Sequence, residues 1–161
     1  MYQFLNWLKT YIEAAFTSDT EITKTVVVEN AYKQGNTVNT TNVPQVQIQL
    51  LDNSEVERYS SFQGEHLSYV PVQLSVYSGQ MKINETTYSA QDASIILGDK
   101  VKSMVAANEI QSQNKNIKRC IRTSMSPALQ LIDGSKVYYT AVRVEFWIAN
   151  PYVAEVIAAN N

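Results

Sequence analysis

The 161-residue chain is poor in the residues on which most enzyme chemistry depends, with one Cys, one His and five Gly. A single Cys cannot form an internal disulfide or a Cys-based zinc site, and a single His excludes His-rich metal sites. The glycines form neither a G-x-G-x-x-G motif nor a P-loop for phosphate. We therefore expect no catalytic, cofactor-binding or metal site, and composition favours a binding or assembly role.

Charge is also scarce, at 17% of residues against about 25% in a typical soluble domain. The 13 Lys and Arg and 15 Asp and Glu give a net charge of −2, so the chain as a whole has no basic field to capture nucleic acid. No apolar run reaches the roughly 18 residues needed to span a bilayer. Residues 1–9 lack the basic segment and cleavage site of a secretory signal, and the lone Cys120 fits a reducing cytoplasm.

Hydrophobic periodicity predicts a single α+β domain over residues 1–161, with a mainly antiparallel sheet of four to five strands and two main helices packed on it. The expected element order is α-β-β-β-α-β-β-α. Helices are expected at 2–16, 89–108 and 151–158, strands at 25–32, 44–50, 67–78, 117–125 and 136–148, and long polar loops at 33–43 and 52–66.

Three local signals refine this prediction. Pro71 removes one ladder donor from the longest predicted strand, which suggests an edge position or a bulge. Residues 82–88 are expected to form only a short connection before the main helix, which Ser89 and Asp92 open with a capping-box pattern. Gly98 inside that helix costs about 1 kcal/mol relative to Ala, which indicates close packing on the sheet.

Two segments carry more aromatic side chains than one sheet contact needs. The first predicted helix presents Trp7 and Tyr11, and the outer face of the last predicted strand presents Tyr139, Arg143 and Trp147. Aromatic residues and Arg are enriched in protein interfaces. The alternative is a large core on both sides of the sheet, and the sequence leaves both interpretations open for the two tryptophans.

A basic cluster lies in and before the predicted strand 117–125, where Lys115, Lys118, Arg119 and Arg122 fall within eight residues. Lys118 and Arg122 share a predicted strand face and flank Cys120. This basic face suits an acidic partner or a DNA backbone, and the simpler alternative is a solvated sheet edge. No aromatics interleave with these charges, which disfavours a stacking platform for single-stranded nucleic acid.

Four stretches, together with the order of elements, resemble the tail terminator (tail-to-head joining) proteins of long-tailed bacteriophages. They are the segment Tyr2-Gln3-Phe4-Leu5, the strand Tyr69–Tyr77, the helix segment Ala90–Ile96 and the closing strand segment Tyr139–Phe146. The resemblance implies a hexameric ring that caps the tail tube, stops its polymerisation and docks on the head connector. The family has no invariant catalytic motif, so no functional residue carries over.

The resemblance also implies partners and a location. The partners are other copies of the chain, the tail tube protein and the head-tail connector protein, with the loops 33–43 and 52–66 at the contacts. Genomic DNA would pass through the lumen without specific binding, and the protein would reside in the virion after assembly in the bacterial cytoplasm. Six compact domains of this size, each roughly 40 Å across, leave a hole wide enough for duplex DNA.

Three other functions fit the same sequence. One is another phage neck protein, such as a head-completion or connector ring protein. The second is a small cytoplasmic enzyme that uses carboxylates or His66, which we expect in a surface loop; no G-x-S-x-G motif supports it. The third is a general protein-interaction module.

Overall fold

The computed structural model describes residues 2–30, 43–51, 58–60, 66–131 and 136–149. These residues form a mixed α+β fold, as the periodicity predicts. The elements in chain order are α1 (Tyr2–Ser18), β1 (Val27–Asn30), β2 (Gln45–Leu50), β3 (Arg58–Ser60), β4 (His66–Ser78), β5 (Met81–Ile83), β6 (Thr86–Tyr88), α2 (Ala90–Met104), α3 (Ala107–Gln113), β7 (Ile117–Met125), β8 (Leu129–Gln130) and β9 (Tyr138–Ala149).

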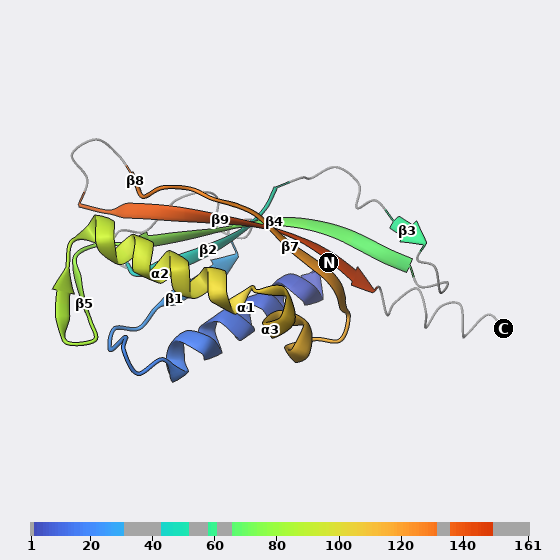
Figure 1. Ribbon diagram of the computed structural model, residues 1–161, viewed down its shortest axis with the longest axis horizontal. Coiled ribbons are helices and arrows are strands. Elements are labelled where there is room, and N and C mark those ends of the chain that lie inside the picture. The colour runs from blue at the N-terminus through green and yellow to red at the C-terminus, as the bar shows by residue number, and fades with distance from the viewer. Residues whose placement is uncertain (1, 31–42, 52–57, 61–65, 132–135, 150–161) are drawn as a thin grey trace.

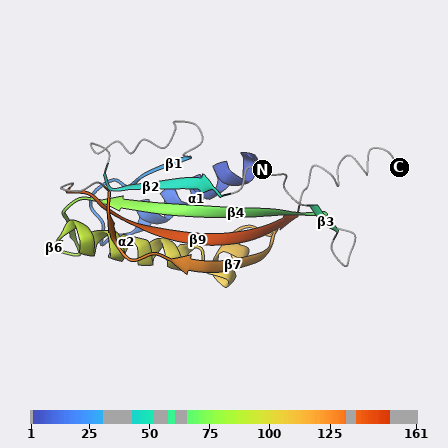
Figure 2. The same ribbon diagram turned by 90° about the horizontal axis from the view of Figure 1, so that it is seen from above.

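The main sheet has the strand order β1-β2-β4-β9-β7, with the short β3 paired to β4 and the short β8 paired to β9 (Figure 2). Among the strand pairs of the described residues only β1–β2 is parallel. The prediction of a mainly antiparallel sheet is therefore confirmed, and five strands make up its continuous path. The longest pairing joins β4 to β9, from Leu67 opposite Ala149 to Ser78 opposite Tyr138.

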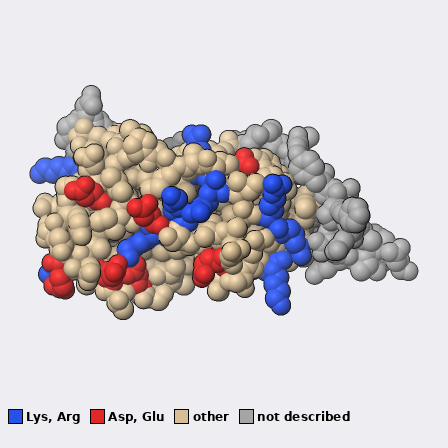
Figure 3. All heavy atoms as spheres, viewed as in Figure 1, with Lys and Arg blue, Asp and Glu red and all other residues tan. Residues whose placement is uncertain are grey.

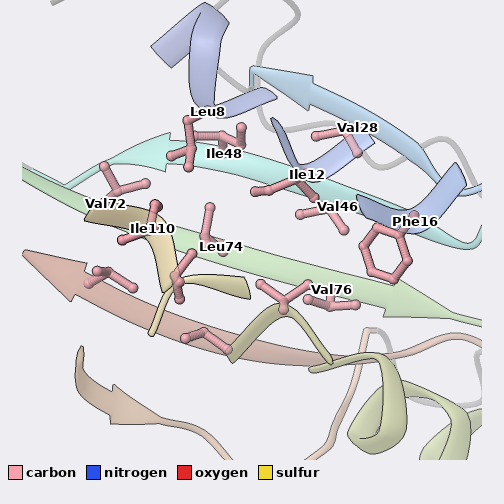
Figure 4. Packing of buried hydrophobic residues seen from close by; sticks show 14 of the residues in the cluster. Leu8, Ile12, Phe16, Val28, Val46, Ile48, Val72, Leu74, Val76 and Ile110 are labelled. Carbon is pink, nitrogen blue, oxygen red and sulfur yellow. The ribbon is translucent and has the colours of Figure 1, made fainter. Parts of the chain in front are cut away.

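All three helices lie on one face of this sheet (Figure 1), and the hydrophobic core fills the space between the two layers. In α1 the buried side chains recur at three- and four-residue spacing, at Leu5, Leu8, Ile12 and Phe16, which is one face of a helix. Figure 4 shows Leu8 and Ile12 beside Ile48 and Val46 of β2. The described residues place no helix on the opposite face of the sheet, which we call the open face.

The predicted main helix 89–108 is wrong at its C-terminal end, because α2 ends at Met104 and a separate helix, α3, follows. Ala106 adopts an extended conformation, with φ −62° and ψ 137°, and starts α3 without a side-chain cap. The N-terminus of α2 is as predicted: Ser89 accepts a hydrogen bond from the backbone N–H of Asp92 at 3.2 Å. The extended Ala106 therefore interrupts the helical conformation between α2 and α3.

The short connection expected at 82–88 is a β-hairpin. Strands β5 and β6 pair antiparallel, and Asn84 and Glu85 between them have φ of 47° and 67°. Two consecutive residues with positive φ are the signature of a type I′ hairpin turn. Glu85 is not a residue that this turn usually selects, and so the sequence gives only a weak signal for it.

Pro71 does not lie on an edge strand, because β4 runs between β2 and β9. The Pro71 carbonyl accepts from the Leu51 N–H at 3.0 Å, just beyond the end of β2 at Leu50. In a strand the N and C=O of one residue point to the same side, so the missing donor faces the side on which β2 has already ended. The edge prediction is therefore wrong for the strand, although the proline costs no bond within the β4–β9 ladder.

The polar loop expected at 52–66 contains part of the sheet. β3 pairs with the start of β4, with Ser60 opposite His66, so His66 begins a strand instead of lying in a loop. The remainder of that loop, the loop 33–43 except Val43, and the expected helix 151–158 lie outside the described residues.

Gly98 confirms the predicted close approach of α2 to the sheet. A Cβ at this position would lie 2.9 Å from Thr140 Cγ2 of β9 and 3.2 Å from Met125 Cε of β7. The first distance is shorter than real Cβ contacts, and Thr140 is fully buried with a stiff, branched side chain. Only glycine lets α2 pack at this distance.

Candidate protein-interaction surfaces

The aromatic side chains of α1 form a stacked row. The Phe4 and Trp7 ring centroids are 5.9 Å apart, and those of Trp7 and Tyr11 are 5.2 Å apart with ring planes only 9° from parallel. The Tyr11 hydroxyl donates to the Met104 carbonyl at 2.7 Å, while burial and the nearby Glu109 carboxylate raise the pKa of Tyr11. Trp7 and Tyr11 are half-buried, and each contacts the core with part of its ring.

A broad groove of about 730 Å³ runs beside this row, between α1 and the α2–α3 segment. Small side chains line much of it, including Ala14 and Ala15 on α1 and Ala106 before α3, and Tyr11 forms part of one wall. The α1 surface therefore combines a row of stacked aromatic rings with a groove that is lined in part by alanines.

The open face holds the second aromatic group, on β4 and β9. Register places Tyr69 opposite Trp147, with ring centroids 5.1 Å apart, and Tyr77 opposite Tyr139, with centroids 5.3 Å apart. The Arg119 guanidinium lies 5.1 Å from the centre of the Trp147 ring, within the range of a cation–π interaction. The sequence places both sets of residues on outer strand faces, but only the register shows which rings meet.

Polar side chains join the two aromatic pairs. Arg143 Nε donates to Gln73 Oε1 at 3.1 Å, and Gln73 Nε2 donates to Ser75 Oγ at 3.0 Å. Near the other end the Tyr69 hydroxyl donates to Glu145 at 2.9 Å. Tyr139, Arg143 and Trp147 thus share the open face, whereas Trp7 and Tyr11 belong to the helix layer. The candidate interface residues form two surfaces on opposite sides of the molecule.

The predicted basic face lies on β7, which ends the strand order of the main sheet. Its expected unbroken alternation is wrong, because the register with β9 shifts between Ile117 and Arg119 and again between Arg122 and Ser124. Lys118 falls in the first irregularity, and Arg122 lies opposite Val144. Arg122 donates to the Lys102 carbonyl of α2 at 3.2 Å, so the basic face includes a lysine from α2 that sequence spacing did not connect with β7.

Cys120 is packed against α2 and does not serve as an accessible nucleophile. Its side chain is 8% exposed, and its thiol donates to the Val105 carbonyl at 3.4 Å. Burial raises the pKa of Cys120 to about 11, although the charge of Arg122 acts in the opposite direction. At neutral pH this group is a thiol, which is the unreactive form.

Within the described residues, no three His, Cys, Asp or Glu side chains group in a way that would hold a metal ion. None of the helices in the same part of the chain has the length and hydropathy of a membrane span.

Comparison of the chain with protein-family models gives no match, and a search of curated proteins gives none either. The inference of function therefore depends on the sequence resemblance and on the two aromatic surfaces.

Proposed function

We propose that this protein is a structural virion component, a ring-forming tail terminator that caps the tail tube of a long-tailed phage, stops its polymerisation and joins the tail to the head connector. It works by assembly, with no catalytic step. Its partners are its own copies, the tube protein and the connector protein, and DNA passes through the lumen of the ring.

The observation that carries the proposal is the presence of two chemically different aromatic surfaces on opposite sides of one protomer. A closed ring needs a heterologous interface, in which one surface of each protomer meets a different surface of the next. The α1 row with Trp7 and Tyr11 supplies one surface, and the open face with Tyr139, Arg143 and Trp147 supplies the other. Tyr, Trp and Arg are the residues that most often dominate interface energies.

The low charge of the chain supports the same proposal. Burying an ion without a partner costs several kcal/mol, so a protein that is covered on several sides by neighbours benefits from neutral polar surfaces. On the open face, the half-buried Gln73 follows this pattern, because it is neutral, donates to Ser75 and accepts a hydrogen bond from Arg143.

The direct test is a mass measurement on the purified protein, alone and after mixing with isolated tail tubes. We expect a closed ring, of six copies of the 18.1 kDa chain, at the tube end in electron micrographs and as an assembled species in native mass spectrometry. A strictly monomeric protein that also fails to bind tubes would contradict the proposal. Binding to the head connector but not to tubes would favour a head-completion protein instead.

A further inference from the structure

We propose that the β7 edge of the sheet binds an acidic polypeptide segment of a partner, with a glutamate side chain of that segment seated between Lys102 and Arg122. This site goes beyond the proposed ring and does not depend on it, because neither Lys102 nor Arg122 belongs to the two aromatic surfaces.

Positive charge is concentrated at this edge. The basic edge comprises Lys102 on α2, Lys115 before β7, and Lys118, Arg119 and Arg122 on β7. The rest of the chain carries the other 8 Lys and Arg against all 15 Asp and Glu, so the basic edge stands in an otherwise acidic molecule. Figure 3 shows basic side chains on the face that presents α2, α3 and β7, with acidic side chains between some of them.

Among the described residues, three of these cations have no ion pair with a carboxylate. The ion pairs of the described residues involve other lysines, namely Lys9, Lys82 and Lys100. Arg122 uses its guanidinium for a carbonyl of α2, and Lys102 and Lys115 form no ion pair within the described part of the chain. A helix C-terminus favours nearby cations because its last carbonyls carry partial negative charge. Lys102 lies in the last turn of α2 and Arg122 bonds to a carbonyl of that turn, so both cations are stabilised there.

A depression of about 230 Å³ lies between these two cations. Its lining combines the basic residues Lys102 and Arg122 with the hydroxyl-bearing Thr123 and Ser124 and the apolar Met125 and Val142. The Arg122 fork carries five N–H donors, so the bond to the Lys102 carbonyl leaves others for a ligand.

This combination suits a glutamate better than a nucleic-acid backbone. The methylenes of a glutamate contact the apolar lining, and its carboxylate accepts charge-assisted hydrogen bonds from the two cations. A duplex needs a row of cations that follows its phosphates and gains nothing from a methionine and a valine. The two register shifts of β7 also interrupt the edge, which opposes long strand addition and leaves the side-chain contact as the main determinant of binding.

The binding test uses a fluorescein-labelled peptide of alternating Glu and Ser, about ten residues long, and measures fluorescence polarisation at roughly 150 mM salt, where distant charges are screened. Probes of the same length with Gln for Glu, and a short DNA duplex, serve as controls. We expect the Gln peptide and the duplex to bind at least about tenfold more weakly than the acidic peptide. No binding of the acidic peptide, or tighter binding of DNA, would overturn the proposal.

Lys102→Gln and Lys115→Gln form a matched pair, because both lysines are exposed members of the basic edge and only Lys102 lines the depression. We expect Lys102→Gln to weaken peptide binding at least about fivefold, and Lys115→Gln less than about twofold. Equal losses would indicate diffuse attraction by the basic edge and would overturn the site. Thermal melts verify that both variants fold, and an unchanged assembly mass for Lys102→Gln separates this test from that of the ring.

Discussion

On the helix-covered face of the β4–β9 pair, Val72 lies opposite Val144 and both side chains are fully buried. On the open face the same two strands place Tyr69 opposite Trp147, where two half-buried rings meet at 5.1 Å. The covered face is mostly apolar, and its side chains pack against those of the helices. The open face is built from cross-strand pairs of aromatic and polar side chains.

This difference between the two faces indicates that one face of the sheet stabilises the fold and the other is suited to recognition. Burial of apolar area supplies most of the stability of a domain, and the covered face provides it almost alone. Cross-strand pairs contribute only about 0.2–1 kcal/mol each, so substitutions there change stability little. The part of the open face around Tyr69, Arg143 and Trp147 is exposed or half-buried and is available for recognition, whereas Ser75 and Tyr77 are already buried in the protomer. Paired variants on the two faces test this division.

The largest expected effect follows from Phe146→Ala. Phe146 is fully buried and meets the Phe4 ring edge-on, with centroids 5.0 Å apart. Its loss leaves a cavity under the sheet and should lower the free energy of unfolding by about 3–5 kcal/mol, measured by urea denaturation. The control is Trp147→Ala, one residue further on the open face, for which we expect less than half of that loss. Equal losses would show that both faces are core.

Gly98→Ala should cost about 1–3 kcal/mol, although alanine is intrinsically the better helix former by about 1 kcal/mol. The added methyl meets Thr140 Cγ2 at 2.9 Å, and β9 cannot retreat without disturbing both of its neighbouring strands. Thr140→Ala in the same chain removes that atom, and we expect it to recover part of the loss in a double-mutant cycle followed by thermal denaturation. Simple additivity of the two changes would contradict the contact.

Trp147→Ala and Trp7→Ala should weaken ring assembly more than they weaken the protomer. Each ring is half-buried in the protomer and is available for further burial by a neighbour. We expect the concentration for half-assembly to rise at least about tenfold, or roughly 1.4 kcal/mol, as measured by analytical ultracentrifugation. Tyr88→Ala is a useful control, because Tyr88 is a half-buried aromatic residue of the β5–β6 hairpin outside both surfaces. If assembly and unfolding free energy fall together, the tryptophans are core residues.

Prediction from sequence was accurate where side-chain period alone decides the structure. The strand 117–125 has the predicted bounds, although its alternation is broken. In β2, Val46 and Ile48 are buried as predicted, but Gln45 and Gln47, which were expected on a polar face, are buried as well. The helix break after Met104 was missed because Val105 and Ala106 are both compatible with a helix. What separates α2 from α3 is the packing of this segment against β7, including the Cys120 contact to the Val105 carbonyl.

The candidate surfaces were only partly predictable for a related reason. The sequence identifies Trp147 and Arg143 as outward-facing, but their partners Tyr69 and Gln73 are 70 or more residues away in the chain, and only the β4–β9 register brings them together. Local sequence patterns do not determine the register between strands that are far apart in the chain. The contribution of Lys102 to the basic edge was missed likewise, because it requires the packing of α2 beside β7.

The smallest expected effect concerns a polar link on the helix-covered side, where Lys100 of α2 donates to Asp19 at 2.7 Å and to Glu21 at 2.6 Å. Burial alone would raise the pKa of Asp19, but the hydrogen bonds from Lys100 and from the Glu21 N–H, together with the charge of Lys100, outweigh it and hold the pKa below its usual 3.8. Burial alone would lower the pKa of Lys100, but its two carboxylate partners hold it above 10.5.

Because the folded-state pKa of Asp19 is lowered, its contribution to stability is present above pH 3.8 and is lost as pH falls through the lowered value. The raised pKa of Lys100 gives a contribution that is present below pH 10.5 and is lost as pH rises through the raised value. Lys100→Met should therefore cost about 1 kcal/mol or less at pH 7 and reduce the pH dependence of the urea midpoint in acid. Lys24→Met, at an exposed lysine that forms no ion pair within the described residues, should change neither. Parallel acid profiles for the wild type and Lys100→Met would mean that this link contributes nothing, and that the covered face is stabilised by apolar packing alone.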